Sequence, residues 1–95
     1  MATYLTTIRE QIKELNPDEF KNLVQSGELD QIMQNYQEQV TLARSEAART
    51  ARKTADQNDP EAVTAAMNMA AMSAQEIEMS QIMEELNYLY APITE

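Results

Sequence analysis

Residues 28–57, ELDQIMQNYQEQVTLARSEAARTARKTADQ, decide the fold, because no glycine or proline interrupts this long stretch. Apolar and small side chains recur along it at alternating steps of four and three residues. They are Leu29, Met33, Tyr36, Val40, Ala43, Ala47, Thr50 and Thr54. This spacing is the heptad seam of helices that pack side by side. We therefore expect one long helix with a partner helix along its length.

The partner helix follows directly in the sequence. Asn58-Asp59-Pro60-Glu61 ends one helix and starts another, with Asp59 as the N-cap and Pro60 at the first helical position. A second long helix is predicted over residues 60–90, and the short loop allows only an antiparallel return. The sequence thus predicts a long, coiled-coil-like antiparallel hairpin.

Two short helices are predicted within residues 3–26, before the hairpin. Apolar side chains form one face of the first helix. They are Leu5, Ile8, Ile12 and Leu15. Asn16-Pro17 ends that helix and starts the next, which Gly27 closes in the left-handed conformation. We expect an all-α single domain over residues 1–95, with the short helices packed at the open end of the hairpin.

The composition argues against an enzyme. The chain has no Cys, His or Trp, which removes thiol and imidazole chemistry and the usual transition-metal ligands. Its single glycine leaves no glycine-rich loop for a nucleotide. We predict no catalytic, cofactor-binding or metal site, and no small-molecule substrate.

The charge and the apolar content indicate the kind of partner. A net charge of −9 repels nucleic acid, and no targeting or membrane-spanning segment is visible, so we expect a cytoplasmic protein that binds neither nucleic acid nor membrane directly. Leu, Ile, Val and Phe make up only 17 of the 95 residues. Such a small core favours burial against a protein partner or a second copy.

The segment at residues 65–72, AAMNMAAM, is the strongest candidate for that contact. Met67 and Met69 lie two positions apart, about 200° around a helix, so both cannot face the same neighbour. Met72, Met79 and Met83 fit an ordinary core stripe.

Our hypothesis is self-association, or docking to another protein, through the Met- and Ala-rich face of the last helix. The apolar area comes from Met67, Met69 and Met72, while Ala66 and Ala70 allow close approach.

Arg49, Arg52 and Lys53 form a second candidate surface, because residues 60–95 hold six acids and no base. We interpret these cations as a patch that orients an acidic partner, such as the last helix of a second copy. A solvated helix face is the alternative reading. Arg44 lies beside the seam and is expected to reach Glu76.

An alternative function uses the acidic side chains. They could imitate the phosphates of a nucleic acid and occupy the basic cleft of a target protein, as a small acidic inhibitor would. They are Glu76, Glu78, Glu84 and Glu85 of the last helix, with Glu10, Glu14, Asp18 and Glu19 from the short helices.

The two helices joined around Asn58-Asp59-Pro60-Glu61 are similar to the helical hairpin of type III secretion needle subunits. The resemblance covers little more than that loop. The first hairpin helix is longer, the two short helices have no counterpart, and the chain is more acidic. What the resemblance implies is a second alternative, a subunit of a helical secretion or phage-type assembly.

Overall fold

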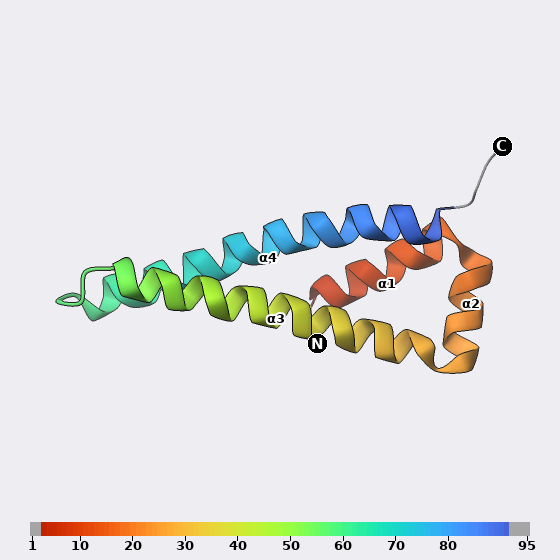
Figure 1. The fold of residues 1–95 in the computed structure, drawn as a ribbon, viewed down its shortest axis with the longest axis horizontal. Coiled ribbons are helices and arrows are strands. Elements are labelled where there is room, and N and C mark those ends of the chain that lie inside the picture. The colour runs from red at the N-terminus through yellow and green to blue at the C-terminus, as the bar shows by residue number, and fades with distance from the viewer. Residues whose placement is uncertain (1–2, 92–95) are drawn as a thin grey trace. The chain divides into compact units, whose positions relative to one another are not determined.

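The computed structural model describes residues 3–91, which form four α-helices and no strand (Figure 1). The helices are α1 (Thr3–Leu15), α2 (Pro17–Ser26), α3 (Glu28–Thr54) and α4 (Pro60–Tyr90). The prediction of an all-α fold, with a long antiparallel hairpin and two short N-terminal helices, is confirmed.

The signals that separate the first three helices act as expected. The backbone N–H of Glu19 donates a hydrogen bond to Asn16 Oδ1 at 3.1 Å, so Asn16 caps α2. Gly27 closes α2 with φ of 83°, and its N–H donates to the carbonyl of Val24. Glycine adopts this left-handed conformation more easily than any other residue, because it has no Cβ.

The loop between α3 and α4 begins earlier than predicted. Helix α3 ends at Thr54 rather than near Gln57. The side-chain amide of Gln57 donates to the carbonyls of Arg52 and Ala55, and Asp56 accepts from the N–H of Asn58 at 2.9 Å. In a longer helix these backbone groups would form hydrogen bonds with each other. Because the side chains of Gln57 and Asp56 bind them instead, α3 ends here.

Contacts divide the chain into two compact units, which we describe separately. Unit 1 combines Met1–Gln37 with Met79–Glu95, and unit 2 is Glu38–Glu78. The predicted single domain remains a prediction.

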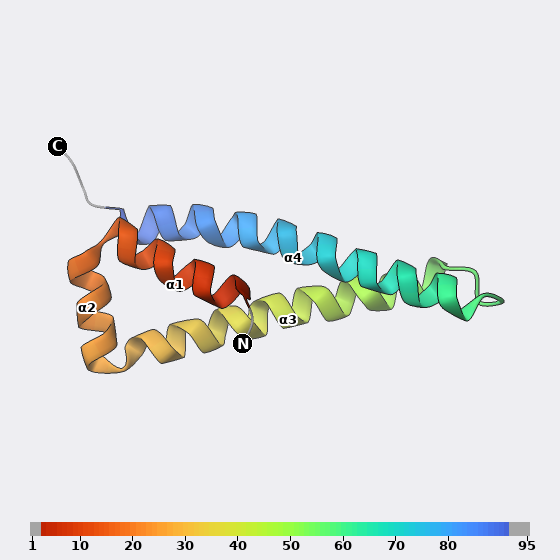
Figure 2. The ribbon, with the colours of Figure 1, turned by 180° about the vertical axis from the view of Figure 1, so that it is seen from behind.

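Unit 1 holds most of the buried apolar side chains. Parts of all four helices, drawn as ribbons in Figure 2, belong to this unit. They are Ile8 and Ile12 of α1, Leu23 of α2, Leu29 and Tyr36 of α3, and Ile82 and Leu86 of α4. The two short helices therefore pack with the open end of the hairpin, as predicted. Arg9 adds a cation–π contact, with its guanidinium carbon 5.8 Å from the centre of the Phe20 ring.

The buried Tyr36 has a raised pKa, from which we expect unit 1 to be sensitive to alkali. Its side chain is 7% exposed, and burial, with Glu85 and Tyr90 nearby, raises its pKa from 10.0 to about 12. The pKa of Tyr90 is raised as well, by burial first and then by Glu19 and other acids. An unfolded tyrosine loses its proton near pH 10. Above that pH the unfolded state holds fewer protons than the native state, so the free energy of unfolding falls.

We therefore expect the free energy of unfolding to fall between about pH 10 and about pH 12, and to fall less in the Tyr36→Phe variant. Urea denaturation at a series of pH values measures this. Tyr88→Phe is the matched control, because Tyr88 is 88% exposed. An unchanged alkaline loss in Tyr36→Phe would contradict the assignment.

Unit 2 is a two-helix hairpin. Two hydrogen bonds cross between its helices, from the side-chain amide of Gln39 to Glu78 and from the Arg44 guanidinium to Gln75. We expected Arg44 to reach Glu76, and this prediction is wrong. Arg44 donates instead to the neighbouring Gln75, because Glu76 lies on the exposed side of α4.

Small side chains fill most of the contact between these helices. Val40 is fully buried, while Ala43 and Ala47 are partly buried. The predicted seam fails beyond Ala47, where Thr50 and Thr54 are exposed and the partly buried positions are Ala51 and Ala55. A straight α-helix has 3.6 residues per turn and drifts away from a strict heptad, so the contact moves to the next position.

Candidate interaction surface

Helix α4 carries two stripes within unit 2. The inner stripe steps by four, three and four residues and is partly buried throughout; it consists of Val63, Met67, Ala70 and Ala74. The outer stripe steps by three, four, three and four residues and is exposed throughout; it consists of Ala62, Ala65, Met69, Met72 and Glu76. One face of α4 therefore packs on α3, and a second face is left uncovered by the described residues.

The methionines divide between these stripes. Met67 is partly buried in the inner stripe, whereas Met69 is 69% exposed. The prediction that both cannot be covered by the same neighbour is confirmed. Met72 is 60% exposed, so its interpretation as core is wrong, while Met79 and Met83 are partly buried. A run of methionines does not reveal which of them faces inward, because α4 is apolar or small on both faces.

The alanines are placed differently from the sequence hypothesis. Ala66 and Ala70 are partly buried, so they lie beside the outer stripe rather than on it. Ala62 and Ala65 are exposed. The small residues that permit close approach to the outer stripe are therefore Ala62 and Ala65. The sequence signal that could have identified these two alanines is the regular alternation of three- and four-residue steps from residue 62 to residue 76.

The outer stripe continues along α4 into unit 1, where the same positions are covered. The alternation of three and four residues leads from Glu76 to Met79, Met83, Leu86 and Tyr90. Leu86 is fully buried and the other three are partly buried. The same heptad positions of one helix are thus covered in unit 1 and exposed in unit 2.

Arg49, Arg52 and Lys53 are exposed near the end of α3, and we call them the basic cluster. With Gln57 they line an open hollow of about 470 Å³. Cations in the last turn of a helix are favourable next to its partial negative charge. Whether the basic cluster binds a partner remains a prediction.

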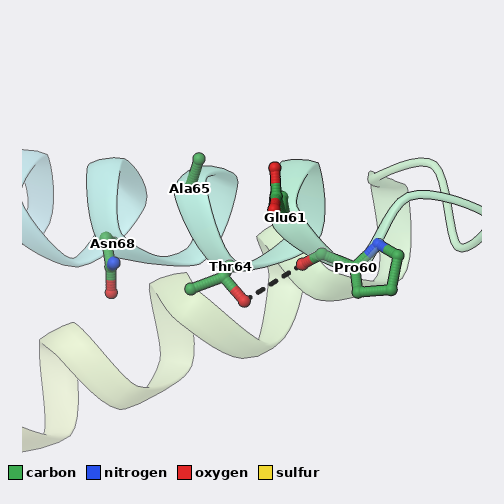
Figure 3. A pocket seen from close by; sticks show the side chains of 5 residues that line it. All are labelled: Pro60, Glu61, Thr64, Ala65 and Asn68. Carbon is green, nitrogen blue, oxygen red and sulfur yellow. Dashed lines mark hydrogen bonds between the residues drawn. The ribbon is translucent and has the colours of Figure 1, made fainter.

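A second open hollow, of about 400 Å³, lies at the start of α4 (Figure 3). It is lined by Pro60, Glu61, Thr64, Ala65 and Asn68. Glu61 and Ala65 point to one side of α4, whereas Thr64 and Asn68 point to the opposite side (Figure 3). Thr64 donates its hydroxyl to the carbonyl of Pro60 at 3.0 Å.

The backbone N–H groups at this end of α4 already have a partner. Those of Glu61 and Ala62 donate to Asp59 Oδ1, at 3.1 and 3.2 Å. A helix start with a capping carboxylate offers little to an anion. The residue that this hollow shares with the outer stripe is Ala65.

Unit 1 has a smaller hollow of about 260 Å³, lined by Leu5, Thr6, Arg9 and Met33. Its one charged group, Arg9, already stacks on Phe20. The lining brings no set of polar groups together, so we assign it no ligand.

The sequence matches no protein-family model, and its comparison with curated proteins and with solved structures gives no significant match. Among the helices of residues 3–91, none has both the length and the apolar character needed to cross a membrane.

Proposed function

We propose that this protein is a non-enzymatic helical assembly protein, and that it self-associates through the outer stripe of α4. The observation that carries the proposal is the exposure of Met69 and Met72, in the middle of a stripe whose continuation is covered in unit 1. Exposed apolar side chains at heptad spacing are the usual contact of one helix with another.

The small core of unit 2 is a second reason to expect that a partner covers the outer stripe. In unit 2, Val40 is a large side chain that is fully buried. Alanines fill most of the remaining contact between α3 and α4. Alanine buries little area, so the hairpin of unit 2 gains little from its own packing. Two flexible, polarizable methionines on the outer stripe would add apolar burial when a second helix covers them.

The remaining parts of the proposal rest on composition and charge. The basic cluster orients an acidic helix, because α4 contains five acidic residues and no basic one. We also propose a cytoplasmic location.

Self-association predicts that thermal stability depends on protein concentration. Diluting the wild-type chain 100-fold should lower its melting temperature by several degrees, because dissociation of a dimer favours unfolding by mass action. Melting curves recorded by circular dichroism measure the shift. A melting temperature unaffected by dilution would overturn self-association.

An acidic inhibitor of a nucleic-acid-binding protein is the alternative function. Among its acids, Glu76, Glu84 and Glu85 are exposed, whereas Glu78 is bonded to Gln39. The inhibitor function makes no demand on how the melting temperature responds to dilution. It predicts instead that binding to a basic target protein weakens steeply as the salt concentration rises. The second alternative, a subunit of a helical secretion or phage-type assembly, requires particles that grow beyond a dimer.

A further inference from the structure

We infer that Met69 and Met72 form an oxidation site. A two-electron oxidant such as hydrogen peroxide converts both to sulfoxides before it reaches the partly buried methionines, and the helical fold survives the change. The outer stripe of α4 thereby turns from apolar to polar. Three features carry the inference: which side chains can be oxidised, how far each is exposed, and which residues make up the outer stripe.

Methionine is the residue of this chain that peroxide attacks. The sequence has seven methionines and no Cys, Trp or His, so no thiol competes for the oxidant. In the reaction the thioether sulfur attacks one oxygen of the peroxide. A sulfur–oxygen bond forms as the oxygen–oxygen bond breaks, and water leaves. The sulfur is oxidised by two electrons, the peroxide is reduced by two, and the methionine becomes a sulfoxide.

The methionines of residues 3–91 differ in their access to solvent. Met69 is 69% exposed and Met72 is 60% exposed. The others in this range are partly buried; they are Met33, Met67, Met79 and Met83. An oxidant dissolved in water must reach the sulfur atom before it can react. We therefore expect Met69 and Met72 to be oxidised first.

The outer stripe depends on these two side chains for its apolar area in unit 2. Its other members are the small Ala62 and Ala65 and the charged Glu76. Met69 and Met72 lie three positions apart, a spacing at which side chains on a helix are neighbours. Oxidation therefore places two polar sulfoxide groups next to each other in the middle of the stripe, and alanine becomes its only apolar residue.

The fold of the monomer should not depend on the oxidation state of this pair. Both side chains are exposed, so a sulfoxide on either remains in water and no contact between α3 and α4 is lost. Met67 differs, because it lies in the inner stripe that packs on α3. A sulfoxide at Met67 would place a polar oxygen within the contact between the helices.

The consequence for self-association rests on the proposed function. A second copy that covers the outer stripe must remove water from the sulfoxides of both copies, which is costly. Oxidation of Met69 and Met72 should therefore raise the dissociation constant at least about tenfold. Because sulfoxide reductases convert the residue back to methionine, the loss of association should be reversible.

Oxidation rates test the site itself. The dilute wild-type chain is treated with hydrogen peroxide, in buffer and unfolded in urea, and fragmentation in the mass spectrometer assigns each added oxygen. Met69 and Met72 should react within about twofold of their rates in urea, and Met67, Met79 and Met83 several-fold more slowly than theirs. Circular dichroism should show unchanged helix content once Met69 and Met72 are oxidised. Equal protection of all five methionines, or loss of helix as the pair reacts, would overturn the inference.

Sedimentation equilibrium before and after peroxide tests the effect on association. The Met69→Leu/Met72→Leu variant removes both exposed sulfurs, and Met33→Leu is the matched control, which removes a partly buried one. Peroxide should weaken the wild type and Met33→Leu alike, and a sulfoxide reductase should restore both. The dissociation constant of the double variant should change by less than about twofold on oxidation. Equal weakening of the double variant would assign the effect to other methionines.

The outcomes separate this inference from the proposed function. A wild-type chain that stays monomeric, with Met69 and Met72 still reacting first, overturns self-association and leaves the oxidation site in place. A dimer that is equally tight before and after both residues are oxidised overturns the effect on association. Selective oxidation, weaker association and its recovery after reduction together support the inference and the proposed function.

Discussion

Replacing Ile82 with alanine should lower the free energy of unfolding by about 2–5 kcal/mol, the usual cost of removing a large side chain from a core. Ile82 is fully buried in unit 1. The total stability of a small domain is only about 5–15 kcal/mol, so this change removes a large part of it. Urea denaturation at fixed protein concentration measures the loss.

Ile77→Ala provides the matched control for Ile82→Ala. Both substitutions are on α4 and change helix propensity equally, but Ile77 is 60% exposed. We expect Ile77→Ala to change the free energy of unfolding by about 0.5 kcal/mol or less. Equal losses in the two variants would show that the buried side of α4 is not where the structure places it.

The Met69→Glu substitution should raise the dissociation constant of the dimer about 100-fold, which corresponds to about 3 kcal/mol. In a dimer that uses the outer stripe it buries a carboxylate in the contact, once from each copy. A charge buried without a partner is costly. Sedimentation equilibrium measures the change.

The fold of the monomer should survive Met69→Glu, because Met69 is exposed in unit 2. Helix content by circular dichroism checks this. Met69→Leu keeps the apolar character and a similar volume, so it should dimerise within a few fold of the wild type. A Met69→Glu dimer as tight as the wild type would show that the outer stripe is not the contact.

Local sequence signals were sufficient for most of the helix boundaries. Asn16, Gly27 and Asp59 each act through a backbone group within a few residues, so their effect does not depend on the rest of the fold. The end of α3 was harder to predict, because Asp56 and Gln57 compete for backbone groups without breaking the sequence pattern.

The orientation of α4 could not be predicted in the same way. Its outer and inner stripes both have heptad spacing, and alanine suits a buried or an exposed position equally well. The hydrogen bonds of Gln39 and Arg44 with α4 resolve the choice, because they show which side of α4 faces α3 in unit 2. That is why the sequence analysis assigned Ala66 and Ala70, rather than Ala62 and Ala65, to the docking face.

The mass of the wild-type chain in solution tests the central claim most directly. At high micromolar concentration, sedimentation equilibrium should give twice the chain mass of 10.8 kDa, because a second copy covers Met69 and Met72. A single species at the mass of one chain, at every concentration measured, would contradict it.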